Sequence, residues 1–310
     1  MATNEDIAWF KKTYGPAIAK KVRGTPFTVD MLTAIACQET GSIWSVLRRK
    51  DLSPAQIAEL CVGDTLDSDR GRRAFPKDKA ELLGHPRGAD MFKVANDALK
   101  AMAKWIPGYS GAASNPNKFC HGYGVFQYDI QFFRTDPDYF LERRWATFEG
   151  SLGKAIEELK NAAAKVGLGG KSSLTDMEMA RIAIAYNTGG FKPAKGLKQG
   201  HKGPDGKYYG ENFFDFLTRA HGIATEAEAE DSEERPLARG KEAVVATSGD
   251  PLLLRSAPEK DPANVIGRLP NGHEVKILAL PDSNGFAELR TRLGGEKLRG
   301  FAAARYLKRG

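Results

Sequence analysis

The sequence predicts an α+β protein of two domains, a mainly α-helical domain followed by a small all-β domain. The chain has 310 residues, about twice the length of a common domain of ~150 residues. Residues 222–243 contain no aromatic residue and almost no large aliphatic one. Before this segment apolar residues recur at helical spacing, and after it they form short runs separated by turn residues. A change of period across a segment that cannot form a core indicates a domain boundary.

Composition and the first residues exclude several classes of protein. Apolar residues make up 41% and charged residues 27% of the chain, which is typical of a soluble globular protein and not of a disordered one. No run approaches the ~18 consecutive apolar residues of a membrane helix, so we expect no membrane insertion. The start of the chain lacks the basic and apolar regions of a signal peptide. We therefore expect synthesis in the cytoplasm without a signal peptide.

The first domain, residues 1–221, is expected to be mainly helical. Apolar residues from Met31 to Ile35 lie at helical spacing, and Thr28 is placed to cap that helix. Further helical patterns, several of them closed by Gly or Pro, cover residues 89–105, 150–167, 174–187 and 211–222. Two irregular segments rich in Gly, Pro, Asp, Ser and Asn are typical of binding loops, at 63–88 and 107–124.

We assign residues 222–249 to an acidic, flexible linker and residues 250–310 to a small β-barrel. The linker cannot bury enough apolar surface to offset its ordering entropy. After it, turn signals recur about every ten residues, which is typical of a small all-β domain. Strands are expected within residues 252–256, 264–269, 273–280, 286–293 and 299–307.

The net charge indicates which ligands the chain could bind, and the cysteines and histidines indicate whether disulfides or metal sites are expected. The formal net charge is +7, and two basic regions flank the acidic linker. Such a balance suits any polyanion: nucleic acid, an anionic membrane surface, or the anionic polymers of bacterial walls. Cys37, Cys61 and Cys120 are an odd number without a CxxC pair, and the five histidines lack metal-binding spacing. We expect no disulfide scaffold, no metal site and no cofactor.

Glu39 is the strongest candidate for a catalytic residue. It lies near the end of a predicted helix, with Ile35, Ile43 and Trp44 close by in the sequence. Apolar neighbours raise the pKa of a carboxyl group toward that of a working general acid. The alternative interpretation is a solvated carboxylate near a helix end.

Two later segments carry side chains suited to binding carbohydrate. Residues 121–133 combine close glycines with an amide among aromatic residues, and residues 183–190 end an apolar helix with a phenol and an amide before two glycines. Amides, phenols and aromatic faces match a sugar polymer, whose hydroxyls need hydrogen bonds and whose C–H faces stack. The candidate residues are Tyr123, Gln127, Tyr128, Tyr186 and Asn187.

These segments, in this order, resemble the lytic transglycosylase and goose-type lysozyme branch of the lysozyme-like superfamily. The family's Glu-Ser, Gly-Leu-Met-Gln and Ala-Tyr-Asn-Ala-Gly segments are matched by Glu39-Thr40, Gly124-Val125-Phe126-Gln127 and Ala185-Tyr186-Asn187-Thr188-Gly189. The resemblance covers roughly residues 15–220. It implies that Glu39 is the catalytic acid and base, that Tyr186 hydrogen-bonds to Glu39 and orients it, and that Thr40, Gln127 and Asn187 belong to the substrate-binding groove.

The match departs from the family pattern at two points. Thr40 stands where the family has Ser, which keeps the hydroxyl and adds a methyl group. Gln127 follows Glu39 at a much greater distance than in the family, so residues 45–115 are interpreted as an insertion beside the groove.

The resemblance implies cleavage of the β-1,4 bond between N-acetylmuramic acid and N-acetylglucosamine in peptidoglycan. In a lytic transglycosylase the protonated Glu39 donates to the glycosidic oxygen and then acts as base while the sugar closes a 1,6-anhydro product. A hydrolytic lysozyme or chitinase-like enzyme instead needs a carboxylate that activates water. No pattern singles one out among Asp51, Asp64, Asp67, Asp69 and Asp129. The transglycosylase is therefore favoured.

Residues 250–310 resemble the bacterial SH3-like domain. The matching residues are Arg255, Ser256 and Pro258, then Gly267, Leu269 and Gly272, then Tyr306 and Leu307. Such domains commonly tether wall hydrolases to peptidoglycan. Phe301 stands where the family has a different aromatic residue, and a barrel that binds protein or packs on its neighbour is the alternative.

Some residues of the chain would also suit other functions. Adjacent Cys120 and His121 suggest a cysteine peptidase, but neighbouring side chains in a chain seldom face each other productively. Basic segments such as residues 201–210 suit phosphates, but no docking motif accompanies them, so we expect no nucleic-acid partner. A non-catalytic wall-binding protein would be unaffected by Glu39→Gln.

The enzymatic hypothesis also sets expectations for partners and location. The expected ligand is the glycan strand of peptidoglycan, so the enzyme acts on the cell wall, in the periplasm or outside the cell. Delivery without a signal peptide points to a phage or prophage lysis system, an injection apparatus or a dedicated secretion machine. An activity that damages envelopes predicts a carrier or an immunity protein that inhibits it.

Overall fold

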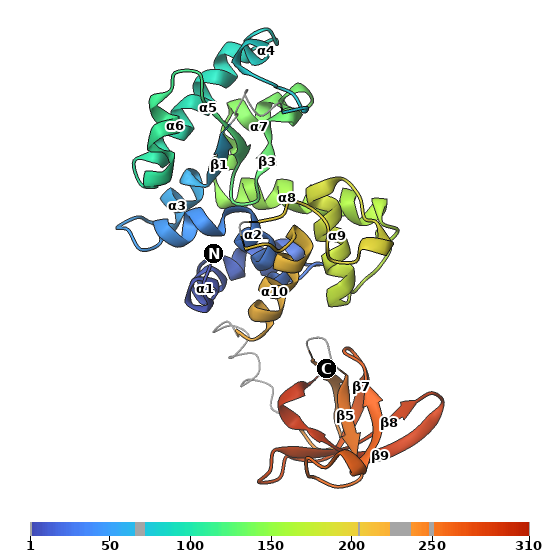
Figure 1. Ribbon diagram of the computed structural model, residues 1–310. Coiled ribbons are helices and arrows are strands. Elements are labelled where there is room, and N and C mark those ends of the chain that lie inside the picture. Colours follow the sequence, from blue (N-terminus) through green and yellow to red (C-terminus); the bar gives the residue numbers. More distant parts are fainter. Residues whose placement is uncertain (1, 66–71, 204, 224–236, 248–250, 310) are drawn as a thin grey trace. The chain divides into compact units, whose positions relative to one another are not determined.

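The chain divides into two compact units, Met1–Ile223 and Ala224–Gly310 (Figure 1). The computed structural model describes residues 2–65, 72–203, 205–223, 237–247 and 251–309. The first unit is mainly helical, and the second contains an antiparallel sheet. Each has its own hydrophobic core. This mixture of helix and strand agrees with the predicted α+β class.

Helices build most of the first unit. They are α1 (Asn4–Val22), α2 (Val29–Leu47), α3 (Pro54–Leu60), α4 (Lys79–Leu83), α5 (Gly88–Ala103), α6 (Ser110–Ser114), α7 (Pro137–Leu141), α8 (Phe148–Lys165), α9 (Asp176–Thr188) and α10 (Tyr209–His221). Helices α5, α8, α9 and α10 confirm the four apolar patterns at helical spacing. Helix α1, which contains Pro16, has no counterpart among the predicted elements.

Helix α2 lies at the centre of the first core. Its predicted cap is confirmed, since the Thr28 side chain accepts a hydrogen bond from the backbone N–H of Met31. Met31, Leu32 and Ile35 are completely buried. Because α1 and α10 both pack against it, α2 is covered on most sides, as expected of a helix whose only charged residues are Asp30 and Glu39.

A small antiparallel sheet stands beside α2. Its strands are β1 (Val62–Thr65), β2 (Cys120–Tyr123) and β3 (Tyr128–Asp129), in that order. Strands β1 and β2 pair with Gly63 opposite Gly122. The segment interpreted as an insertion, residues 45–115, contributes β1 and helices α3 to α6. Within the predicted loop 107–124, residues 120–123 form strand β2 of this sheet.

The second unit holds a seven-stranded antiparallel sheet among its described residues. The strands are β4 (Glu242–Val245), β5 (Leu252–Arg255), β6 (Val265–Leu269), β7 (Glu274–Ala279), β8 (Phe286–Leu293), β9 (Glu296–Ala303) and β10 (Leu307–Arg309). Their order is β10-β4-β7-β8-β9-β5-β6. Alternate residues such as Leu254, Ile277 and Leu289 form the core.

The predicted start of the second domain, residue 250, is too late. Strand β4 lies within the segment assigned to the linker, yet it pairs with both β7 and β10. Alternating burial in Glu242–Val245 places Ala243 and Val245 in the core. Residues 224–236, 248 and 249 of the predicted linker lie outside the described residues.

Across the described ranges, no helix combines the length and the apolar composition that crossing a membrane requires.

Candidate active site

Glu39 lies on the wall of a groove of 540 Å³ in the first unit. Helix α2 supplies Glu39 and Ser42, while α8 and the end of α9 supply other walls. The three-stranded sheet and the short 3-10 helices beside it contribute the rest of the lining. The polar and ionisable side chains on the groove include Glu39, Asp64, His121, Gln127, Tyr128, Asp129, Glu158, Asn161, Lys165, Tyr186 and Asn187.

The carboxyl group of Glu39 is held by a tyrosine of another helix. Tyr209 is the first residue of α10, and its hydroxyl group donates a hydrogen bond of 2.8 Å to Oε1 of Glu39. Desolvation by the surrounding core raises the pKa of Glu39 to about 7, and the charge of Asp64 acts in the same direction. The Tyr209 hydrogen bond opposes this rise, because it stabilises the carboxylate. Near neutral pH, Glu39 is therefore populated both as an acid and as a base.

The predicted contact between Tyr186 and Glu39 is not the one observed. The Tyr186 hydroxyl donates to the backbone carbonyl of Phe126 at 2.6 Å. Tyr186 still lines the groove, at the C-terminal end of α9. The hydrogen bond that the resemblance implies between Tyr186 and Glu39 is made instead by Tyr209, which was not among the predicted site residues.

Gln127 is placed in the groove by two glycines of the sheet. Its Nε2 donates to the carbonyl of Gly124 at 2.8 Å, and its own φ is +55°. A Cβ atom on Gly122 would lie 2.1 Å from Oε1 of Gln127, and one on Gly63 would lie 2.6 Å from it. Only residues without a side chain allow the amide to cross the paired strands at this point.

The other predicted substrate-binding residues divide into two groups. Tyr128 and Asn187 line the groove, and the Tyr128 ring stacks on Phe132 at a centroid distance of 4.7 Å. Thr40 and Tyr123 are completely buried and do not line it.

The two buried side chains have structural partners. The Thr40 hydroxyl donates to the carbonyl of Val125 at 2.7 Å, and the Tyr123 hydroxyl donates to that of Cys120 at 2.7 Å. Both therefore hold the segment 120–125 in place. The structure does not put either side chain on the groove wall, where the predicted substrate contacts would require them.

Two of the five candidate second carboxylates lie on the groove. Asp129 is paired with Arg72 and lies 3.4 Å from Nδ1 of His121. Burial would raise the pKa of Asp129, but His121 and Arg72 outweigh it and lower that pKa. Asp64 is more exposed and lies 3.8 Å from Nε2 of His121. Asp51 is not part of the groove lining, and residues 67 and 69 lie outside the described residues.

The cysteines are poorly placed for nucleophilic chemistry. Cys37, Cys61 and Cys120 are all buried and unpaired. Burial raises the pKa of each thiol, that of Cys61 to about 12, so the reactive thiolate is suppressed. Within the described ranges, no group of three or more His, Cys, Asp or Glu side chains is arranged to hold a metal ion.

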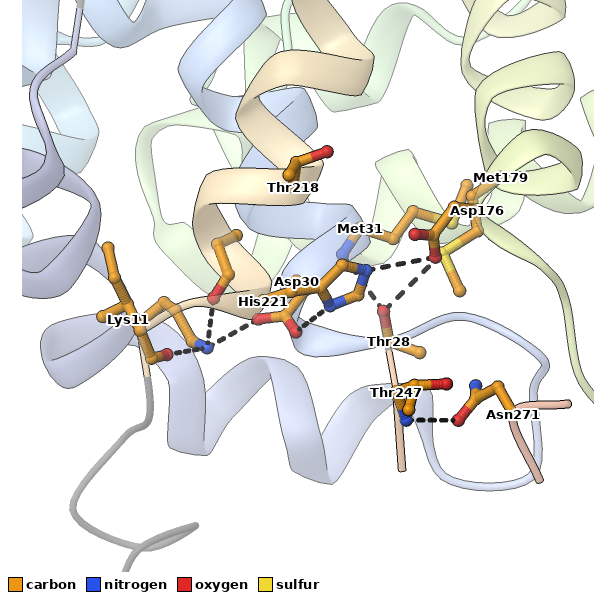
Figure 2. Close-up of polar contacts among 12 residues, drawn as sticks. Lys11, Thr28, Asp30, Met31, Asp176, Met179, Thr218, His221, Thr247 and Asn271 are labelled. Atoms are coloured by element: carbon orange, nitrogen blue, oxygen red, sulfur yellow. Dashed lines mark hydrogen bonds and ion pairs between the residues drawn. The ribbon is translucent and has the colours of Figure 1, made fainter. Parts of the chain in front are cut away.

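A largely buried ionic network joins helices α1, α2, α9 and α10 (Figure 2). Asp30 of α2 lies between Lys11 at 2.6 Å and Nδ1 of His221 at 2.8 Å. The other ring nitrogen of His221 lies 3.1 Å from Asp176 of α9. Burial alone would lower the pKa of His221, but hydrogen bonds to Asp176 and Asp30 raise it to about 9. The network therefore ties α1, α2, α9 and α10 together.

Several groove residues were not anticipated from the sequence. Helix α8 presents Glu158, Asn161 and Lys165, one helical turn apart, toward the groove. Tyr209 carried a weak signal, because it stands in the first turn of a strongly amphipathic helix. Its partner lies 170 residues away in the chain. Searches for related proteins found no matching family model, no matching curated protein and no matching solved structure.

Proposed function

We propose that the first unit is a glycosidase that cleaves the glycan strands of peptidoglycan, acting as a lytic transglycosylase with Glu39 as its acid and base. The observation that carries the proposal is the environment of Glu39. This carboxyl group has a pKa of about 7, receives a hydrogen bond from Tyr209 and opens onto a groove. These are the properties required of a group that gives and then takes a proton.

The reaction begins with a protonated Glu39. Its proton passes to the glycosidic oxygen between N-acetylmuramic acid and N-acetylglucosamine, and the bond from that oxygen to the anomeric carbon breaks. An oxocarbenium-like centre develops on the muramic acid ring. Glu39 becomes a carboxylate, and the Tyr209 hydroxyl stabilises that charge.

The second step uses the sugar itself. The 6-hydroxyl of the muramic acid attacks the anomeric carbon and transfers its proton to the Glu39 carboxylate, which yields a 1,6-anhydro end. The amide of Gln127 and the phenol of Tyr128 are available to hold sugar hydroxyls and ring faces.

A hydrolytic lysozyme is the second candidate, and Asp64 favours it. Asp64 lines the same groove, and its charge contributes to the raised pKa of Glu39. A carboxylate in this position can activate a water molecule, whereas Asp129 is already engaged by Arg72 and His121. In that case the product carries a reducing end.

The second unit is proposed to hold the enzyme on the wall, as the resemblance to SH3-like domains implies. The substrate places the activity in the cell wall. A carrier or immunity protein remains part of the proposal, because uncontrolled cleavage would damage the producing cell.

Mass spectrometry of fragments released from purified sacculi tests this proposal. Wild-type protein is expected to release anhydro-muropeptides, and Glu39→Gln to release at least about a hundredfold less. Cys120→Ser is the control for the cysteine-peptidase alternative and should keep its activity, because the Cys120 thiol takes no part in the proposed reaction. Products with reducing ends would identify a hydrolase. Fragments released from chitin in a parallel reaction would identify chitin as the substrate in place of peptidoglycan. Cut stem peptides, or no fragments at all, would refute the glycosidase.

A further inference from the structure

Three neighbouring strands of the second unit carry basic side chains directly opposite one another. Arg290 of β8 pairs with Arg299 of β9 on one side and with Lys276 of β7 on the other. Two residues along the hairpin, Arg292 pairs with Lys297. We call these five residues, Lys276, Arg290, Arg292, Lys297 and Arg299, the basic ladder.

A tight turn fixes the register of the ladder. Strands β8 and β9 are joined by Gly294 and Gly295, whose φ values are +59° and +90°. A two-residue turn with both φ angles positive matches the twist of a hairpin and needs glycine-like residues. Leu289 and Thr291, which alternate with Arg290 and Arg292, are buried. The ladder therefore lies on the solvent side of the sheet.

The ladder is only partly neutralised. Glu288 lies 2.7 Å from Arg299, and Glu242 lies 3.9 Å from Lys276. Within the part of the chain that the structure describes, no ion pair joins Arg290, Arg292 or Lys297 to a carboxylate. Like charges placed directly opposite on paired strands are destabilising. The opposed cations therefore do not stabilise the folded state. Their presence favours a role in binding a negatively charged ligand.

We propose that the basic ladder binds a linear phosphodiester polymer of the bacterial envelope; the choice of an envelope polymer rests on the function proposed above. The ladder lines a hollow of 730 Å³. Three of its five cations are arginines, whose guanidinium groups match phosphate oxygens in pairs.

The spacing of the ladder fits such a polymer. Successive rungs are two residues apart, or about 7 Å along the strand. Two residues correspond to six backbone bonds. A glycerol phosphate repeat also has six bonds from one phosphorus to the next, so its phosphates meet successive rungs. No aromatic side chain is found among the described residues that line the hollow, so it lacks the stacking platform typical of single-stranded nucleic-acid sites.

The test uses the full chain carrying Glu39→Gln, so that binding is measured without cleavage. The probe is poly(glycerol phosphate), titrated at several salt concentrations. Adding Arg290→Thr and Arg292→Thr is expected to weaken binding roughly 30-fold at low salt, about fivefold for each cation removed. The salt dependence of binding should also become shallower. Arg268→Thr with Lys308→Thr is the matched control, because both residues are exposed, basic and outside the ladder. This control should bind nearly as the parent does.

Stability separates lost binding from lost folding. Removing opposed like charges should leave the melting temperature of the ladder variant equal to or above that of its parent. Unchanged binding in that variant, or equal loss in the control, would overturn the proposal. So would tighter binding of single-stranded DNA of the same phosphate number.

Cleavage is read separately from binding. Wild-type protein is assayed on sacculi stripped of phosphodiester polymers. Binding of poly(glycerol phosphate) without cleavage would refute the glycosidase and leave the ladder's role intact. Cleavage without binding would refute the ladder's role alone.

Discussion

Replacing Tyr209 with phenylalanine is expected to raise the pKa of Glu39 and to extend cleavage activity to higher pH. The Tyr209 hydroxyl donates to Oε1 of Glu39 at 2.8 Å and stabilises the carboxylate. Burial and the neighbouring Glu39 raise the pKa of Tyr209 well above its ordinary value, so the phenol stays a donor throughout the working range. Phenylalanine keeps the ring and removes only that donor.

The size of the effect follows from the kind of bond removed. A hydrogen bond to a charged acceptor contributes about 1.5–3 kcal/mol. Since one pKa unit corresponds to about 1.4 kcal/mol, loss of the bond should raise the pKa of Glu39 by about 1–2 units from its value near 7. The first step needs protonated Glu39, so activity falls as the pH rises through this pKa. The falling limb of the pH–activity profile, where activity declines at high pH, should therefore move to higher pH by the same 1–2 units.

Initial rates of fragment release between about pH 5 and pH 10 measure this limb. Tyr186→Phe is the control, because the Tyr186 hydroxyl donates to the Phe126 carbonyl and not to Glu39. That variant can be slower, but its falling limb should coincide with that of the wild type. A Tyr209→Phe limb that does not move, or equal shifts in both variants, would refute this account of the Glu39 pKa.

Two further predictions concern the groove and the ionic network. Gly122→Ala should lower activity by about ten- to a hundredfold, because the new Cβ would lie 2.1 Å from Oε1 of Gln127 and displace that amide. Gly170→Ala is the control and should have no effect, because its new Cβ would meet no atom within 4 Å. Equal rates for the two variants would argue against a role for Gln127. His221 has a folded-state pKa of about 9 against 6.5 for the free side chain, so its contribution is fully present below about pH 6.5 and lost as the pH rises through 9. Urea unfolding should therefore find His221→Gln less stable than wild type by about 3 kcal/mol more at pH 6 than at pH 9.5. A difference that does not change with pH would contradict this role.

Local patterns predicted several elements of both units. The cap at Thr28, the apolar spacing of α8 and α9 and the alternating runs of β7 and β8 are local properties, because backbone hydrogen bonding and burial act over a few residues. Strand β4 escaped prediction because it follows directly on an acidic segment. Only its pairing with β7 and β10 makes it part of the sheet.

From the chain alone came the prediction of a carboxyl group among apolar neighbours on a helix, at Glu39, and the choice of Gln127, Tyr128 and Asn187 as candidate binding residues. Tertiary packing set which phenol bonds to Glu39, because Tyr209 and Tyr186 have the same chemistry and differ in position: α10 packs on α2, whereas α9 packs on α8 and α10. It also turned Thr40 and Tyr123 inward and set Arg290 between two other cations. Side-chain direction and strand register depend on contacts between distant segments, and no local pattern contains them.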